Sequence, residues 1–268
     1  MRAVELTGKH VLVTGASRGI GEAMARRFAA AGARVSIAAR SAEPLAALAS
    51  EIGATAFTVD LLDADAVDAL VPRVEAAAGP IDVLVNNAGL ESSTWFVDEP
   101  PNTIRDVIRL NLEASLVLTR AALPGMLERG QGHVVFTSSL AGSTGFPGLA
   151  TYSATKAALN NFVAALRIEL RDTPLQFTIV APGPVDTRMW GVLEDSTAYA
   201  PMLRRLRRLQ LIPTKTPDLV ARRTVHAVAS GRRHVRMPRR LSLVFWLGEA
   251  PRRITEALLV RVPFVRPR

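Results

Sequence analysis

The chain of 268 residues is long enough for one large domain or two small ones, and its 49% of hydrophobic residues is ample for a sizeable core. It has no cysteine, which excludes disulfides, thiolate catalysis and cysteine-based zinc sites, and its four histidines lack the spacing of metal ligands, so we expect no metal site. The formal charge of +9 is uneven, because residues 188–268 carry 18 basic and 5 acidic side chains; a near-neutral core precedes a basic final third.

Strand-like and helix-like segments alternate along the chain. Short apolar runs predict strands at 10–15, 34–40, 55–60, 81–89, 133–139 and 176–183. Helical composition between them predicts helices at 19–33, 43–53, 64–79, 101–129 and 152–171. This alternation is typical of an α/β fold with a doubly wound, Rossmann-like parallel sheet. Residues 218–238 add a helix and the last strand, so we expect a single domain over 1–238 and a basic, apolar helical extension over 239–268.

The composition gives little support for a membrane-spanning or nucleic-acid-binding protein. The N-terminal segment lacks the apolar run of a signal peptide, and no stretch approaches the ~20 apolar residues that span a bilayer. The basic C-terminal third has no recognisable nucleic-acid-binding motif and few aromatic residues among its basic ones, so we expect no nucleic-acid partner. We expect a cytoplasmic chain, or one bound to a membrane surface.

The stretch "TGASRGIG" (14–21) lies between the first strand and the first helix. Gly15, Gly19 and Gly21 permit a tight turn whose backbone N–H groups approach a pyrophosphate, and the helix directs its positive N-terminal end at the same anion. A glycine cluster alone could be a generic turn. Its place between a strand and a helix at the start of the fold predicts dinucleotide binding.

The residues near the expected ribose favour NADP(H) over NAD(H). An NAD site has an acid after the second strand, whereas this strand ends with Ala39 and Arg40. Arg18 lies inside the glycine turn, and two guanidinium groups suit a 2′-phosphate that arginine binds bidentately. The alternative is that Arg18 and Arg40 are solvated surface side chains.

The sequence resembles the classical short-chain dehydrogenases/reductases. The resemblance runs in order through most of the first 190 residues. Its motifs are "TGASRGIG" (14–21), Asp60 in "TVDL", "NNAG" (86–89), Asn111 in "RLNLEAS", "SS" (138–139), "YSATK" (152–156) and "PGPVDT" (182–187).

The resemblance implies a coenzyme-binding role for several of these positions. Asp60 would bond the adenine amino group, although it could instead cap the next helix in competition with Asp63. Asn87 and the residues after it would contact the adenine ribose, and the "PGPVDT" turn would hold the nicotinamide carboxamide. The full set of expected coenzyme-binding residues is Gly15, Ser17, Arg18, Gly19, Ile20, Gly21, Arg40, Asp60, Leu61, Asn87, Ala88, Gly89, Tyr152, Lys156, Pro182, Gly183, Val185 and Thr187.

Tyr152 and Lys156 carry the expected chemistry. Residues four apart share a helix face, and a nearby cation lowers the pKa of a phenol from its usual value of about 10. Tyr152 can then exchange a proton with an alcohol or ketone oxygen. Ser139, at the end of a strand, could polarise the carbonyl, with Ser138 as its rival. The resemblance implies that Asn111 distorts the long helix and holds a water that relays protons to Lys156; otherwise it is an exposed polar residue.

The final third has two expected roles. Residues 188–213 would form a lid and substrate wall, or pack as an ordinary helix. Their bulky apolar side chains favour a hydrophobic substrate: Trp190, Val192, Leu193, Tyr199, Met202, Leu203 and Leu206. In the extension, an apolar group flanked by arginines suits either a membrane surface or packing against a subunit or the chain itself. These residues are Leu243, Val244, Phe245, Trp246 and Leu247, with Arg239, Arg240, Arg252 and Arg253.

Together these observations predict an NADP(H)-dependent oxidoreductase that interconverts a hydrophobic ketone, or a 3-oxoacyl-type carbonyl, and a secondary alcohol. The expected catalytic residues are Ser139, Tyr152, Lys156 and Asn111. The alternative is a non-catalytic NADP(H)-binding sensor of the same fold. The resemblance also implies a homodimer or homotetramer.

Overall fold

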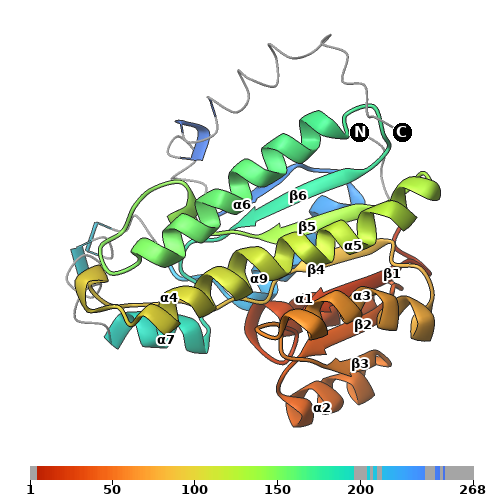
Figure 1. Ribbon diagram of the computed structural model, residues 1–268, viewed down its shortest axis with the longest axis horizontal. Coiled ribbons are helices and arrows are strands. Elements are labelled where there is room, and N and C mark those ends of the chain that lie inside the picture. Colours follow the sequence, from red (N-terminus) through yellow and green to blue (C-terminus); the bar gives the residue numbers. More distant parts are fainter. Residues whose placement is uncertain are drawn as a thin grey trace.

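Seven parallel strands form one sheet in the order β3-β2-β1-β4-β5-β6-β7 (Figure 1). The computed structural model describes residues 5–195, 204–205, 208–209, 213–238, 245–247 and 250. The strands are β1 His10–Thr14, β2 Arg34–Ala39, β3 Thr55–Thr58, β4 Val83–Asn86, β5 His133–Thr137, β6 Gln176–Ala181 and β7 His234–Arg236. The strand order reverses between β1 and β4, so the predicted doubly wound sheet is confirmed, with its switch point between these two strands.

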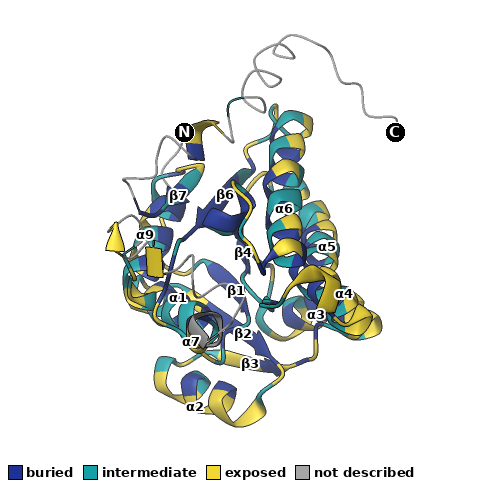
Figure 2. Cartoon of the chain, turned by 90° about the vertical axis from the view of Figure 1, so that its left-hand side faces the viewer, coloured by how far each residue is buried: buried dark blue, intermediate teal, exposed yellow. Residues whose placement is uncertain are grey.

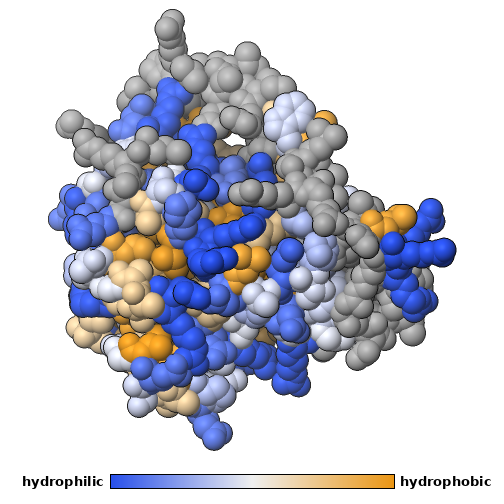
Figure 3. Space-filling model, turned by 180° about the vertical axis from the view of Figure 1, so that it is seen from behind, coloured by the Kyte–Doolittle hydropathy of each residue, from blue (hydrophilic) through white to orange (hydrophobic). Residues whose placement is uncertain are grey.

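Helices cover both faces of this sheet. One face carries α1 (Gly19–Ala30), α2 (Ala42–Ile52) and α9 (Pro217–Ala229), and the other carries α3 (Ala64–Ala78), α5 (Ala114–Glu128) and α6 (Ala150–Glu169). Figure 2 shows the buried strands between α5 and α6 on one side and α1 and α9 on the other. On the outside of the α1 and α9 face, hydrophilic side chains are mixed with hydrophobic ones (Figure 3).

The strands are apolar because both of their faces are covered. All five residues of β1 are buried, and its register joins Val11 to Val35 on one side and to Val83 on the other. Alternate side chains of each strand enter one of two cores, so Leu12 packs below α3 and α5 whereas Val11 packs below α1 and α9. The sheet therefore fixes the positions of the loops that follow the carboxyl ends of its strands.

The long helix expected over 101–129 is divided into three segments. It begins as α4 (Pro101–Ile108), passes through a π-helical segment (Arg109–Glu113) and continues as α5. A π segment inserts one extra residue into a helical turn and turns its side chains away from the regular register. Asn111 lies in this segment and is fully buried, so it is not the exposed polar residue of the alternative reading.

The final third is described only in part. Helix α7 (Arg188–Asp195) begins the expected lid, and β7 is the predicted last strand. The described structure does not include the side chains of Val192 and Leu193 in this lid. It also does not include any part of Tyr199, Met202, Leu203 and Leu206. In the extension, Phe245 is buried in the core on the α3, α5 and α6 side of the sheet, with the Arg236 guanidinium over its ring, and Trp246 is 49% exposed. Leu243, Val244 and the four flanking arginines lie outside the described residues. No helix within the described ranges is both long and apolar enough to cross a bilayer.

Candidate active site

A cavity of about 730 Å³ opens at the carboxyl ends of the strands, where the turns after β1, β4, β5 and β6 meet. Ligands of open α/β sheets bind beside such a switch point. All the residues expected to bind the coenzyme line this cavity, and so does Ser139. Of the expected site residues, Asn111 alone is not part of its lining.

Two turns interlock to form the back of the cavity. Gly15 has a φ of +66°, and a Cβ atom added to it would lie 2.8 Å from the Cα atom of Ala88, so this position needs glycine. Asn87 donates its side-chain amide to the carbonyl oxygen of Thr14 over 3.0 Å, and its backbone N–H donates to the Thr14 hydroxyl over 3.0 Å. The glycine turn is therefore held against the "NNAG" turn, and α1 directs its N-terminal N–H groups, which suit an anion, at the same end of the sheet.

The Ser–Tyr–Lys group (Ser139, Tyr152 and Lys156) forms the opposite part of the lining. Helix α6 places Tyr152 and Lys156 one turn apart, with the Lys156 ammonium 5.6 Å from the centre of the Tyr152 ring. Lys156 Nζ donates to the carbonyl oxygen of Thr137 over 2.9 Å, which fixes this ammonium at the end of β5. Ser139 follows β5, and its hydrogen bond with Tyr152 lowers the pKa of that phenol.

Burial, however, dominates both pKa values. Burial raises the pKa of Tyr152 to about 12; the Ser139 hydrogen bond opposes this rise, and the carboxylate of Glu91 adds to it. Burial also lowers the pKa of Lys156 to about 8. This shift is opposite to the acidified phenol that the Tyr–Lys spacing predicts, because the cost of removing a phenolate from water exceeds the effect of the Ser139 hydrogen bond. In the protein alone, the phenol is held as a proton donor.

The two serines after β5 have different partners. Ser138 is buried, and its hydroxyl donates to the carbonyl oxygen of Lys156 over 3.2 Å. Ser139 instead accepts a hydrogen bond from the N–H of Ala141 over 3.1 Å and contacts Tyr152. Ser138 therefore fastens α6 to β5, whereas Ser139 keeps a hydroxyl beside the phenol.

Asn111 connects the π segment to the loop after β4. Its Oδ1 accepts from the N–H of Leu90 over 2.7 Å, and its Nδ2 donates to the carbonyl oxygen of Leu90 over 2.8 Å and to the hydroxyl of Thr155 over 3.2 Å. A Cβ atom at Gly89 would lie 3.1 Å from Asn111 Oδ1 and 3.6 Å from Lys156 Nζ. Asn111 thus lies just behind the lining, next to Lys156, and holds the loop that carries Gly89.

The structure decides which of Asp60 and Asp63 caps the helix that follows them. Asp63 caps α3, because its side chain accepts from the N–H groups of Asp65 and Ala66. Asp60 is exposed, accepts from the N–H of Leu62 over 3.1 Å and lines the cavity beside Leu61. The capping alternative for Asp60 is therefore not what the structure has.

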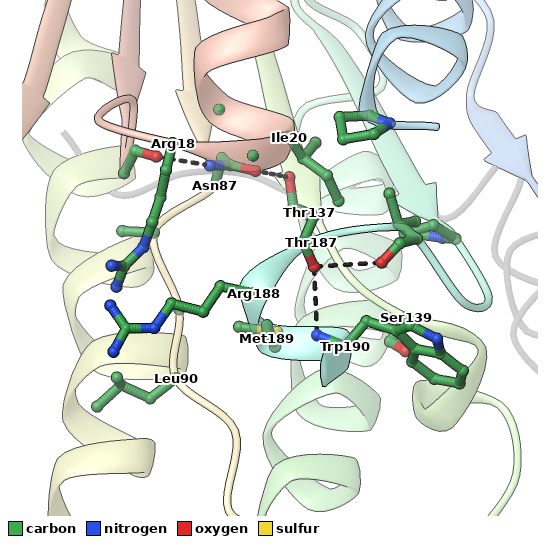
Figure 4. Close-up of a pocket in the computed structure, with 18 of the residues that line it drawn as sticks. Arg18, Ile20, Asn87, Leu90, Thr137, Ser139, Thr187, Arg188, Met189 and Trp190 are labelled. Atoms are coloured by element: carbon green, nitrogen blue, oxygen red, sulfur yellow. Dashed lines mark hydrogen bonds between the residues drawn. The ribbon is translucent and has the colours of Figure 1, made fainter. Parts of the chain in front are cut away.

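Several lining residues were not singled out in the sequence. Apolar side chains line the same cavity as the Ser–Tyr–Lys group, and Trp190, the one of them expected from the sequence, is 8% exposed. The others come from four separate loops and helices and carry no local signal: Leu90, Leu110, Leu140, Phe146, Leu149 and Met189. Arg188 also lines the cavity (Figure 4). Within the described part of the chain, no group of three or more histidine or acidic side chains could hold a metal ion.

Comparison with known proteins agrees with this geometry. The family described as "short chain dehydrogenase" matches residues 9–198. A protein named ketoacyl reductase HetN, from Nostoc sp., is 38% identical over 228 residues, which cover 83% of this chain and 76% of that protein. A dehydrogenase/reductase SDR family protein 7-like from Drosophila melanogaster is 32% identical over 265 residues, covering 91% of this chain and 80% of that protein.

A solved structure is also similar over most of its length. The crystal structure of a metagenomic short-chain oxidoreductase in complex with NADP matches with a TM-score of 0.72 and 32% identity, covering 87% of this chain and 97% of that one. The family match runs from the start of β1 to beyond β6 and so includes the glycine turn and the turns after β4, β5 and β6. The chain belongs to the short-chain dehydrogenase/reductase family of oxidoreductases.

Proposed function

We propose that this protein uses NADP(H) to interconvert a hydrophobic ketone, or a 3-oxoacyl-type carbonyl, and a secondary alcohol. One observation carries the proposal. Ser139, Tyr152 and Lys156 line one part of a cavity whose other part is a glycine turn at the start of α1. Fold alone does not justify an activity, but a proton donor, a hydroxyl beside it and a phosphate-binding turn in one cavity do.

The preference for NADP(H) rests on the charges near the end of β2. Arg18 and Arg40 both line the cavity, and the strand ends without a carboxylate that would bond a ribose 2′-OH. The solved structure with NADP is similar over 87% of this chain, which supports the same coenzyme here. The apolar lining around Trp190 and Phe146 favours a hydrophobic substrate, and the relative named ketoacyl reductase supports a 3-oxoacyl compound among the candidates.

The chemistry that a bound reduced coenzyme would supply is a hydride for the carbonyl carbon. Tyr152 would donate its phenolic proton to the carbonyl oxygen, and Ser139 would orient that oxygen through its hydroxyl. The raised pKa of Tyr152 suits this direction, because the phenol arrives protonated. Lys156 would hold its ammonium near the phenolate that remains, which stabilises this charge until a proton returns. Hydride and proton together give the secondary alcohol.

Tyr152→Phe tests this assignment, because it removes the proton and keeps the ring. We expect kcat for ketone reduction to fall by about 10²- to 10⁴-fold, the usual contribution of a general acid, while NADPH binding changes little. Activity would be followed as loss of reduced-coenzyme absorbance with a panel of hydrophobic ketones and 3-oxoacyl thioesters. Retained turnover in Tyr152→Phe would remove the phenol from this role.

The same panel separates the proposal from the coenzyme-binding sensor. A wild-type protein that binds NADPH tightly but turns over none of these carbonyls or the matching alcohols would favour the sensor. A protein that binds neither NADPH nor NADH would contradict both readings.

A further inference from the structure

Four arginines line the cavity, and they differ in their partners. Arg26 is neutralised, since it donates to Glu22 over 2.9 Å and also pairs with Glu51. The other three, which we call the arginine rim, are Arg18, Arg40 and Arg188, and all are exposed. No carboxylate of a described residue lies within ion-pair distance of any of them. The rim therefore presents to the cavity three guanidinium groups that form no ion pair with a described residue.

Two members of the rim belong to different elements and point toward the same part of the cavity. Arg18 belongs to the glycine turn before α1, and Arg188 is the first residue of α7. Their guanidinium groups point toward the same part of the cavity, beside Leu90 (Figure 4). Glu91 is close enough to feel the charge of Arg18, but burial raises the pKa of its carboxyl group and so disfavours the charged form. Neither guanidinium group forms an ion pair with a carboxylate of the described residues.

Local structure does not explain an arginine at position 188. The Thr187 hydroxyl accepts from the N–H of Trp190 over 3.3 Å, which caps α7 and directs residue 188 away from this cap (Figure 4). A cation in the first turn of a helix is opposed by the helix dipole, so the helix itself gains nothing from Arg188. Like charges that converge also repel. An anion bound between Arg18 and Arg188 would remove both costs.

We propose that Arg188 binds a phosphate group of the coenzyme and, together with Arg18, clamps that phosphate between the glycine turn and α7. This inference rests on the proposed NADP(H) function. The phosphate is either the 2′-phosphate or the pyrophosphate, because both are anions that guanidinium groups bind bidentately. Since Met189 and Trp190 follow Arg188 directly and line the cavity, the clamp also fixes the apolar substrate wall once the coenzyme is bound.

The test measures binding directly, by calorimetry, for wild type, Arg188→Ala and Arg188→Gln. The probes are NADPH, NADH and adenosine 2′,5′-bisphosphate, which carries a 2′-phosphate but no pyrophosphate. We expect Arg188→Ala and Arg188→Gln to weaken NADPH about tenfold, as for loss of one charge-assisted contact. An equal loss for NADH would assign the contact to the pyrophosphate, and a loss confined to NADPH and the bisphosphate would assign it to the 2′-phosphate. The matched control is Arg73→Ala, an exposed arginine of α3 outside the cavity lining.

A double variant tests the sharing of one phosphate. If Arg18 and Arg188 hold the same group, the losses from Arg18→Ala and Arg188→Ala are not additive in the double variant. Wild-type affinity of both Arg188 variants for all three probes would overturn the clamp. So would a change limited to the KM of an anionic ketone, because Arg188 would then serve the substrate. A wild-type protein that binds no coenzyme would instead contradict the proposed function. Failure of the clamp and failure of the proposed function are therefore distinguishable.

Discussion

The charged side chains of the Ser–Tyr–Lys group and of the arginine rim differ in their burial and in their partners. Lys156 is 4% exposed and its ammonium is fixed to a carbonyl oxygen of β5, whereas Arg18, Arg40 and Arg188 are exposed and have no ion-pair partner among the described residues. Burial shifts the pKa values of Tyr152 and Lys156 strongly. The buried group can therefore tune a proton transfer, and the rim is suited to attracting an anion from water.

This difference predicts different consequences of mutation. A change in the buried group alters electrostatics at low dielectric, where one charge has a large effect, so it acts on the rate of the chemical step. A change in the rim acts on charges screened by water and salt, so it alters which coenzyme binds and how tightly. If a change in either region had the consequence expected of the other, this distinction between the two regions would be wrong.

Lys156→Met should have the largest effect. It keeps the buried stem but removes the ammonium 5.6 Å from the Tyr152 ring, so we expect kcat for ketone reduction to fall about 100-fold or more. The control is Lys9→Met, because Lys9 precedes β1 at the far end of the sheet and bonds Gln131 there. Steady-state kinetics that showed equal losses for both variants would contradict a special role for the buried ammonium.

The same ammonium predicts a pH dependence. Lys156 has a pKa of about 8 and loses its charge as the pH rises through that value, whereas Tyr152, at about 12, stays protonated. The kcat/KM for reduction, which reports the free enzyme, should be level below about pH 8 and fall about tenfold per unit above it. In Lys156→Met the profile should be low and level over the same range. A falling limb that persists in this variant would belong to another group.

Asn111→Ala should have the next largest effect, on stability. The change removes three buried hydrogen bonds and leaves the N–H and carbonyl oxygen of Leu90 without their partner. We expect a loss of about 2–4 kcal/mol in the free energy of unfolding, measured by urea denaturation. Asn161→Ala, an exposed site on α6, is the matched control and should change stability little. If both variants unfolded at the same urea concentration, Asn111 would not be holding the loop after β4.

The sheet and the glycine turn could be predicted from the sequence because their signals are local. Apolar runs such as "HVLVTG" bury on both faces of a parallel sheet, and Gly15 is needed where a Cβ atom would meet Ala88. The resemblance to the short-chain dehydrogenases/reductases predicted the coenzyme-binding residues, and these line the cavity at the carboxyl ends of the strands.

The features that sequence reasoning missed depend on contacts between distant segments. The raised pKa of Tyr152 comes from burial by several loops, which no spacing of tyrosine and lysine reveals. Arg188 points toward the same part of the cavity as Arg18, although 170 residues separate them in the chain. The burial of Phe245 in the core likewise depends on packing between segments far apart in the chain.

Arg40→Ala should have the smallest effect, and only on coenzyme choice. Arg40 follows β2, where the strand presents no carboxylate to a ribose, so its loss should weaken NADPH about tenfold and leave NADH nearly unchanged. Added salt should reduce the difference between the two coenzymes in the wild type, because exposed charges are screened. Calorimetric titration of both coenzymes at low and high salt measures this, with Arg73→Ala as the control. An equal loss for NADH would show that Arg40 contacts a part common to both coenzymes, and a fall in kcat at saturating NADPH would show that the rim takes part in the chemical step.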